Sequence, residues 1–298
     1  METEENFPLV SVIVPTYRRH EKLKNCLDSL SKSSYKNIEV IVVNDDPNDD
    51  LKDFVEQYGA RYIQNQAEGF VIKCRNIGAK MSKGEILFFV DDDNVFEPDT
   101  ISSLVKKYVV TEKIGLIGPL MFDSDGELWF WGSRLSWFKP FPSKQSVDFS
   151  DGELIRTDVV PNAYMIYRDL YFKIGGEDES LLFYDEELDL AVRLKNSGFI
   201  SYIYTGSKIV HDYGHLFEHI SSFRLFANFR SMLIVERRYA NMLQFTIFFV
   251  YFVGYALFYA LYRIPYSMHV KNKHEYYSSM FRGIKEGLFS TSKFTRKA

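Results

Sequence analysis

Three short apolar runs punctuate the first ninety or so positions of the chain. They are LVSVIV (9–14), IEVIVV (38–43) and EILFFV (85–90). Each run is apolar at nearly every position rather than at every second one, which is typical of parallel strands buried on both faces. The pattern therefore predicts a sheet whose strands are covered on both sides.

Helix-type spacing fills the gaps between these runs. Residues 20–33 place three leucines on one face, residues 69–84 form a second helical pattern closed by Gly84, and residues 184–199 predict a later helix. The inner positions are Leu23, Leu27 and Leu30 in the first helix, and Leu190, Ala191 and Leu194 in the last. Strands that alternate with helices predict an α/β fold with a Rossmann-like, doubly wound and mostly parallel sheet.

Polar side chains follow each of the three apolar runs. They are Pro15, Thr16, Tyr17 and Arg18 after the first, Asn44, Asp45 and Asp46 after the second, and Asp91, Asp92, Asp93 and Asn94 after the third. Turns favour Asp and Asn for local reasons, and this explains any one of the groups. Ligands of open α/β sheets bind beyond the carboxyl ends of the strands, so the three groups together indicate a binding site.

Asp91 and Asp93 have the arrangement of a divalent-metal pair. Side chains two positions apart in extended chain project the same way, and Mg²⁺ and Mn²⁺ are commonly held by one or two carboxylates together with substrate phosphates. We expect Asp92 to point elsewhere, to a substrate hydroxyl or a helix N-terminus. His211, after a later apolar run, is a candidate third ligand, with His215 as its substitute; the alternative is a hydrogen-bonded structural histidine.

A second acidic group opens the predicted helix at 184–199. The helix dipole and an i,i+4 ion pair account for Asp189 and Arg193. They leave Glu186 and Glu187 unexplained. One of these two glutamates can serve as a general base that deprotonates a hydroxyl.

The C-terminal part has a different character. Residues 242–262 are nearly uncharged and long enough to span a bilayer, yet basic residues flank them on both sides. This predicts a helix that lies in or dips into an anionic membrane surface, or a re-entrant hairpin that turns at Gly254. The preceding stretch 216–239 is expected at the interface as well. The alternative is a packed helical core of an oligomer.

Composition narrows the function classes. A net charge of −4 gives no reason to expect nucleic acid as the main partner. Cys26 and Cys74 lack metal-type spacing and favour a reduced, cytosol-facing compartment. The N-terminus has neither the basic nor the apolar region of a signal peptide. The aromatic stretch 129–141 lies in a long connection, 123–157, and connections of this length are usually functional or mobile.

The order of these motifs resembles the inverting family 2 glycosyltransferases, which have the GT-A fold. The motifs are SVIVPTYRR, IEVIVVNDDP, KCRNIGAKMSKGEILFFVDDDN, IGGEDESLLFYDEELDLAVRLKNSGF and IVHDYG. The resemblance covers about residues 8–215. It implies a catalytic domain over 1–215, with a nucleotide-sugar half at about 8–120 and an acceptor half at about 121–215. The aromatic stretch 129–141 is then expected to border the acceptor. Residues 216–298 then form a helical region that associates with a membrane or an oligomer.

The resemblance also implies roles for individual residues. Those expected to bind a nucleotide-sugar donor are Pro15, Thr16, Tyr17, Arg18, Asn44, Asp45, Lys73, Arg75 and Asp92. Asp91 and Asp93 match the family's D-x-D and would hold Mn²⁺ or Mg²⁺ against the diphosphate, with His211 assisting. The chain reads Glu-Glu where the family usually has Glu-Asp, so the catalytic base is expected at Glu187 or Glu186.

The implied activity is metal-dependent, inverting transfer of a sugar to a hydroxyl of a glycan or polyprenyl-linked acceptor. The cytoplasmic face of the cell membrane is the expected location, and a homo-oligomer through the C-terminal helices is the alternative use of that region. A metal-dependent nucleotidyltransferase would need a Gly-rich phosphate loop, but PTYRR follows the first strand. A non-catalytic nucleotide-sugar-binding subunit is compatible with the Glu-Glu departure. A membrane-attached scaffold would leave the acids unexplained.

Overall fold

The computed structural model describes residues 7–66, 70–139, 143–144, 148–212, 221–266 and 272–290. The strands are β1 (Val10–Thr16), β2 (Ile38–Asn44), β3 (Arg61–Gln64), β4 (Ile86–Phe89), β5 (Asn94–Phe96), β6 (Ile114–Asp123), β7 (Leu128–Phe130), β8 (Ser133–Arg134), β9 (Ser143–Lys144), β10 (Leu154–Thr157), β11 (Tyr164–Tyr167) and β12 (Ile200–His211). The helices are α1 (His20–Ser31), α2 (Lys52–Glu56), α3 (Phe70–Met81), α4 (Thr100–Val109), α5 (Arg168–Lys173), α6 (Glu186–Asn196), α7 (Ser222–Tyr239), α8 (Met242–Phe258), the π-helical η2 (Tyr259–Arg263), α9 (Ile264–Tyr266) and α10 (Lys273–Phe289).

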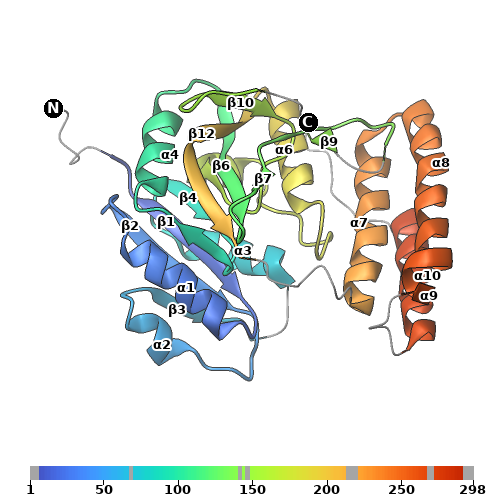
Figure 1. The fold of residues 1–298 in the computed structure, drawn as a ribbon, viewed down its shortest axis with the longest axis horizontal. Helices are drawn as coiled ribbons and strands as arrows, with labels where there is room; N and C mark the ends of the chain where they lie inside the picture. Colours follow the sequence, from blue (N-terminus) through green and yellow to red (C-terminus); the bar gives the residue numbers. More distant parts are fainter. Residues whose placement is uncertain are drawn as a thin grey trace.

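A single large mixed sheet forms the centre of the molecule, with helices packed on its faces (Figure 1). Its order is β10-β12-β6-β11-β4-β1-β2-β3, with β5 on β12 and β7 on β6. Strands β4, β1, β2 and β3 are mutually parallel, as are β6 and β12. Strand β11 runs antiparallel between these two parts. The predicted α/β class, with a central and mostly parallel sheet, is confirmed.

The register of the strands brings the polar strand ends together. Thr16 lies opposite Asn44 at the end of β1 and β2, and Ile13 lies opposite Phe89, so the acids that follow β4 emerge beside the end of β1. On the other side, β12 pairs with β5 so that His211 lies opposite Asn94. The expected convergence of the three strand ends is therefore observed, and His211 joins them.

Two glycines let α3 and the start of β4 approach β1. A Cβ at Gly78 would lie 2.4 Å from Cγ2 of Ile13, so only glycine permits this helix–sheet contact. Helix α3 ends at Met81, so the prediction that Gly84 closes it is wrong. Gly84 instead lies against β1, where a Cβ would come within 2.7 Å of the Leu9 carbonyl oxygen. The backbone contact, rather than a helix cap, explains the glycine.

Helix α7 lies between the central sheet with its covering helices and the outer helices α8 and α10 (Figure 1). Most of its length is buried, and Ile234 and Val235 pack with Ile72 of α3 and Leu188 of α6. The expectation that 216–239 lies at a membrane interface is therefore wrong for α7, and residues 216–220 of that stretch lie outside the described residues. Its aromatic and aliphatic residues face protein on two sides.

Close approach of α10 to α7 depends on two glycines. A Cβ at Gly283 would lie 2.4 Å from the carbonyl oxygen of Phe226, and one at Gly287 would lie 2.8 Å from Cβ of Leu233. Because these neighbours are backbone and buried side-chain atoms, α10 can seat against α7 only with glycine at both positions. The two helices thus form one packed unit.

Helix α8 continues through η2 and α9 as a 25-residue apolar helix, Met242–Tyr266. It is long and apolar enough to cross a membrane, and only 11% of its most apolar window is buried within the protein. The chain runs straight through Gly254 as helix, so the alternative of a hairpin turning at this glycine is wrong.

Candidate active site

A cavity of about 530 Å³ lies at the carboxyl ends of β1, β2 and β4. Its walls come from these strand ends, the start of α3, the segment before α6, the end of β12 and the start of α7. The lining residues are Pro15, Thr16, Tyr17, Arg19, Asp45, Phe70, Val71, Cys74, Asp91, Asp92, Asp93, Asn162, Phe183, Tyr184, His211, Ser221, Phe223 and Arg224.

The three consecutive aspartates point to different partners. Asp91 accepts hydrogen bonds from Nη2 of Arg75 at 2.8 Å and from Nδ2 of Asn162 at 2.7 Å. Asp92 accepts from Oγ1 of Thr16 at 2.7 Å. Asp92 thus faces a hydroxyl of the protein itself, and its expected contact with a substrate hydroxyl or a helix N-terminus stays a prediction.

Arg19 is the cation that sequence reasoning missed. Its Nη1 lies 2.8 Å from Oδ1 of Asp92 and its Nη2 lies 2.5 Å from Oδ2 of Asp93. Burial raises the pKa of Asp92 to about 7, and the charge of Arg19 opposes this shift. Burial acts in the same direction on Asp93, but a hydrogen bond and charge from His211, together with Arg19, bring its pKa below the usual value. The only signal in the sequence was the second arginine of PTYRR.

Asp93 and His211 form the part of the site that fits a divalent cation. Nε2 of His211 lies 3.2 Å from Oδ1 of Asp93, and this oxygen is buried beside the cavity. Nδ2 of Asn162 lies 3.4 Å from the same imidazole nitrogen, between it and Asp91. The described residues contain no ready-made group of three or more His, Cys, Asp or Glu ligands. A carboxylate and an imidazole are suitable ligands for Mn²⁺ or Mg²⁺ when phosphate oxygens and water complete the shell.

Asp91 remains a predicted ligand, although its carboxylate is occupied by Arg75 and Asn162. His215, the substitute for His211, lies outside the described residues.

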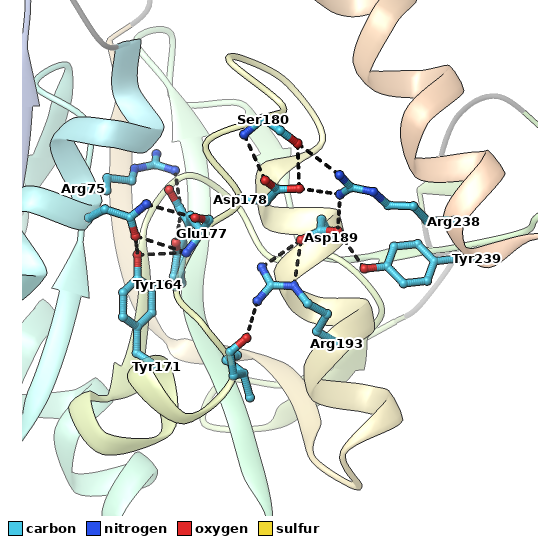
Figure 2. Close-up of polar contacts among 12 residues, drawn as sticks. Arg75, Tyr164, Tyr171, Glu177, Asp178, Ser180, Asp189, Arg193, Arg238 and Tyr239 are labelled. Atoms are coloured by element: carbon cyan, nitrogen blue, oxygen red, sulfur yellow. Dashed lines mark hydrogen bonds and ion pairs between the residues drawn. The ribbon is translucent and has the colours of Figure 1, made fainter. Parts of the chain in front are cut away.

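Arg75 links the strand-end acids to the acids of α6. Its side chain is buried, and its guanidinium contacts Asp91 through Nη2 and both Glu177 and Glu187 through Nη1, at 3.1 Å and 3.0 Å for the last two. Figure 2 shows the guanidinium of Arg75 beside Glu177, whose carboxylate also accepts a hydrogen bond from the hydroxyl of Tyr164. Burial raises the pKa of Glu177 to about 7 against the opposing charge of Arg75. Glu177 was not predicted as a site residue.

The two candidate bases have different surroundings. Glu186 is buried, its Oε2 accepts no hydrogen bond from the described residues, and burial raises its pKa well above the ordinary value. Glu187 pairs with Arg75 and keeps 17% of its side chain exposed. Nη1 of Arg75 lies 3.8 Å from Oε1 of Glu186 and 3.0 Å from Oε1 of Glu187, so Glu187 is the more accessible of the two and the more closely paired with the arginine that binds Asp91. Neither is among the residues that line the cavity.

The predicted donor residues divide into two sets. Pro15, Thr16, Tyr17, Asp45 and Asp92 line the cavity. Within this set, Asp45 accepts hydrogen bonds from Nδ2 of Asn65 at 2.8 Å and from the backbone NH of Phe70 at 2.9 Å, which fixes its carboxylate at the start of α3.

The other four predicted donor residues are not among the lining residues. Arg18 pairs with Asp46. Asn44 donates to the carbonyl oxygen of Asp49 and to the hydroxyl of Tyr62 on β3. Lys73 is half-buried on α3, and Arg75 lies beneath the acids. Their assignment to the donor stays a prediction.

One wall of the cavity comes from the region that was predicted to be a separate appendage. Phe223 of α7 stacks on Phe70 of α3 with ring centroids 4.5 Å apart and planes 9° apart. Arg224 lies over the ring of Phe183 at 5.6 Å. Local sequence patterns carry no signal for this contact, because it joins segments about 150 positions apart. The predicted division at residue 215 thus lies just before a segment that shapes the cavity.

The aromatic connection reaches the same region. The ring of Trp129 lies 5.0 Å from the imidazole of His211, and the ring of Trp137 lies 5.7 Å from that of Tyr239 on α7. Trp129 thereby limits the positions open to His211. Its role beside an acceptor stays a prediction.

Residues 11–171 match glycosyl transferase family 2 over more than half of the chain. The chain belongs to this family. The polar strand ends described above fall within the matched segment, and the predicted family and the GT-A fold are confirmed. The acids that follow β4 in this glycosyltransferase thus lie within the segment that matches the family.

Among curated proteins, the chain is similar to the uncharacterized glycosyltransferase RP339 of Rickettsia prowazekii, with 30% identity over 61% of this chain and 57% of that protein. It is 35% identical to the glycosyltransferase GlyA of Streptococcus pneumoniae over 34% of this chain and 15% of that protein. The matched part thus spans little more than half of the first relative and less of the second.

Two solved structures share the fold. GalNAc-T7 with UDP, GalNAc and Mn²⁺ superposes with a TM-score of 0.62 at 17% identity, over 94% of this glycosyltransferase and 55% of that chain. The mannosyltransferase PcManGT from Pyrobaculum calidifontis, in complex with GDP-Man and Mn²⁺, superposes with a TM-score of 0.57 at 14% identity. This superposition covers 97% of this chain and 89% of that chain. At such identities the likeness establishes the fold alone.

Proposed function

We propose that this glycosyltransferase moves a sugar from a nucleotide diphosphate donor to a hydroxyl of a glycan or polyprenyl-linked acceptor, with Mn²⁺ or Mg²⁺ and with inversion at the anomeric carbon. The observation that carries the proposal is the position of Arg75. It ties Asp91, beside the candidate metal ligands, to Glu187, the candidate base. One site therefore contains the groups for holding a diphosphate and for activating a hydroxyl.

The cavity has a division that suits a nucleotide sugar. Tyr17, Asp45 and Phe70 form an aromatic end with a fixed carboxylate, which matches the stacking and hydrogen bonding of a nucleoside. Asp93 and His211 form the end that suits a cation with its diphosphate. Two proteins of the same fold were solved with UDP or GDP-Man and Mn²⁺, which supports a nucleotide and a divalent cation as ligands of this cavity.

The residues of the chain then have distinct chemical tasks. A bound Mn²⁺ or Mg²⁺ would neutralise the charge that develops on the leaving diphosphate, held by Asp93 and His211. Arg19 provides a second positive charge at the same place. Glu187 accepts the proton of the acceptor hydroxyl, and Arg75 holds its carboxylate in position. Attack from the side opposite the diphosphate would give inversion.

Paired substitutions test the base. We expect Glu187→Gln to lower sugar transfer at least about a hundredfold, in the range typical of a lost general base, with donor binding nearly unchanged. Glu186→Gln is the matched control one residue away and should keep most of the activity. A screen of UDP-, GDP- and dTDP-sugars with Mn²⁺, read by thermal shift and then by transfer, identifies the donor for this comparison.

Two outcomes would revise the proposal. Normal turnover by Glu187→Gln together with an inactive Glu186→Gln would move the base to Glu186. Donor binding by the wild type without transfer or hydrolysis, in the presence of metal and acceptor extracts, would favour the non-catalytic nucleotide-sugar-binding subunit, which the Glu-Glu sequence supports.

We also propose that α8 attaches the enzyme to the cytoplasmic face of the cell membrane. Its exposed apolar side chains are Met242, Leu243, Val250, Tyr251, Val253, Leu257, Phe258, Leu261 and Tyr262, the last two in η2. At about 100° per residue these positions cover roughly half of the helix circumference, more than the stripe that one packed partner helix would bury. Such placement suits an acceptor carried by a membrane lipid and assembly of a surface polysaccharide.

Flotation with anionic phospholipid vesicles tests this attachment. The double variant Val250→Asp with Leu257→Asp should remain in the soluble fraction, whereas Val110→Asp, which changes an equally exposed valine at the end of α4, should float like the wild type. If the wild type does not float but elutes as a dimer that the double variant dissociates, the face is instead an interface between two copies of the chain.

A further inference from the structure

The helix that begins with the candidate base is anchored from the side by α7. Asp189 lies two residues after Glu187 and is fully buried. Its Oδ2 accepts from Nε of Arg193 at 2.8 Å, which is the expected pair within α6. Its Oδ1 accepts from the hydroxyl of Tyr239 at 2.7 Å and lies 3.3 Å from Nη1 of Arg238. Figure 2 shows both α7 side chains converging on this carboxylate.

Arg238 also binds the segment that precedes α6. Its Nη1 lies 2.5 Å from Oδ2 of Asp178, and its Nη2 donates to Oγ of Ser180 at 3.0 Å. One guanidinium therefore joins α6, through Asp189, to the turn at 178–180. A planar group with several N–H donors in fixed directions is suited to hold two carboxylates at a set separation.

The chain between that turn and α6 has an unusual backbone. Leu182, Tyr184 and Asp185 have φ values of 68°, 68° and 61°. Residues other than glycine rarely occupy this left-handed region, and they persist there only where surrounding structure holds them. The strained segment leads directly into Glu186 and Glu187.

Helix α7 supplies the hydrogen bonds that hold this segment. Oγ of Ser231 donates to the carbonyl oxygens of Leu181 at 2.6 Å and Phe183 at 3.0 Å, and Nη1 of Arg230 donates to that of Ser180 at 2.5 Å. Contacts from α7 thus flank the first turn of α6 on both sides, one set before the base and one set after it.

We infer that Arg238 and Tyr239 are positioning residues for the candidate base. Helix α7 thereby helps to set the geometry of the active site and is more than a connection to the outer helices. The inference rests on the proposed function. An i,i+4 pair with Arg193 would suffice to neutralise Asp189 in an ordinary surface helix. Two further donors from a distant helix, one of them also bound to Asp178, instead fix where the first turn of α6 lies. Displacements of about 1 Å at a reacting group can lower a rate about a hundredfold.

Steady-state kinetics of Arg238→Ala, Arg238→Lys and Tyr239→Phe test the inference. We expect kcat to fall at least about tenfold in Arg238→Ala and less in Tyr239→Phe, with the donor KM within about twofold of wild type, because neither residue lines the cavity proposed to hold the donor. Arg238→Lys should recover part of kcat, since one ammonium can bind Asp189 or Asp178 but not both. Arg237→Ala is the matched control, because Arg237 donates instead to the Gly287 carbonyl of α10.

Amide hydrogen exchange of residues 181–193 provides a readout that needs no substrate. Exchange there should accelerate in Arg238→Ala and Tyr239→Phe and remain at the wild-type rate in Arg237→Ala. A wild-type kcat in Arg238→Ala, or a loss of activity that only matches a loss of folded protein, overturns the inference. If the wild type transfers no sugar, the proposed function fails, and unchanged exchange would then still refute the anchoring of α6 by α7.

Discussion

Arg19 and Asp93 form an ion pair, with Nη2 of the arginine 2.5 Å from Oδ2 of the aspartate. Asp93 is also the carboxylate that we propose as a metal ligand, with His211 on its other oxygen. The arginine therefore provides positive charge at the position where a divalent cation is expected. An arginine and a cation that share one carboxylate oppose each other electrostatically.

This opposition predicts the behaviour of Arg19→Gln. Without donor, the variant should bind Mn²⁺ several-fold more tightly than the wild type, because a nearby positive charge no longer repels the ion. Electron paramagnetic resonance of free Mn²⁺ measures the affinity directly. Arg18→Gln is the matched control, since Arg18 pairs with Asp46 instead. Equal or weaker Mn²⁺ binding by Arg19→Gln would show that the two cations do not compete.

Arg75→Met is expected to destabilise the fold as well as to remove activity. The side chain is buried and contacts Asp91, Glu177 and Glu187. Removing one partner of a buried ion pair leaves uncompensated charge and costs about 3–5 kcal/mol. The free energy of unfolding in urea measures the loss. Arg61→Met, at an exposed arginine that donates to the Met81 carbonyl, should cost less than about 1 kcal/mol; equal losses in the two variants would contradict the proposed role.

A pH dependence of stability is expected from Glu236 of α7. Burial, followed by the charge of Asp185, raises the pKa of Glu236 to about 8 from an ordinary 4.5. Between these two pH values the folded state binds a proton that the unfolded state has released. The free energy of unfolding should therefore fall as pH rises from about 4.5 to about 8, by an amount on the order of a few kcal/mol.

Glu236→Gln should flatten this decline and be more stable than the wild type near pH 8. Glu56→Gln, at an exposed glutamate on α2, controls for the loss of one acid. Parallel curves for the wild type and Glu236→Gln across this range would exclude a raised pKa in the folded state.

Two glycine substitutions should have opposite consequences. Gly283→Ala places a Cβ 2.4 Å from the Phe226 carbonyl oxygen, whereas Gly254→Ala meets nothing within 4 Å in the outer helix α8. We expect the first to destabilise the protein by about 1–3 kcal/mol through overpacking. The second should be neutral or stabilising by up to about 1 kcal/mol, because alanine favours helix. Thermal unfolding of both variants gives the comparison, and a neutral Gly283→Ala would mean that α10 can move away without loss.

The sequence predicted the strand ends well because a buried parallel strand leaves a plain local signature. Asp91 and Asp93 follow such a run, and the β1–β4 register then determines that they emerge beside Thr16. His211 was found for the same reason, as the last residue of β12 opposite Asn94.

The missing site residues depended on contacts between distant segments. Nothing near Asp189 in the sequence indicates that Tyr239, fifty positions later, binds it. The pattern of α7 was interpreted as facing a membrane, because apolar residues at helical spacing look alike whether lipid or protein covers them. Arg19 was passed over because Asp93 was expected to bind a metal, and Asp92 was expected to face a substrate hydroxyl or a helix N-terminus.

The glycine contacts between α10 and α7 have a genetic consequence. Helix α10 holds α7 in place through backbone-to-backbone approach, and α7 supplies Phe223 and Arg224 to the cavity. A premature stop codon or frameshift in the segment that encodes α10 would leave every predicted catalytic residue intact. Such alleles should nevertheless score as nulls for sugar transfer, indistinguishable in phenotype from changes at the acids themselves.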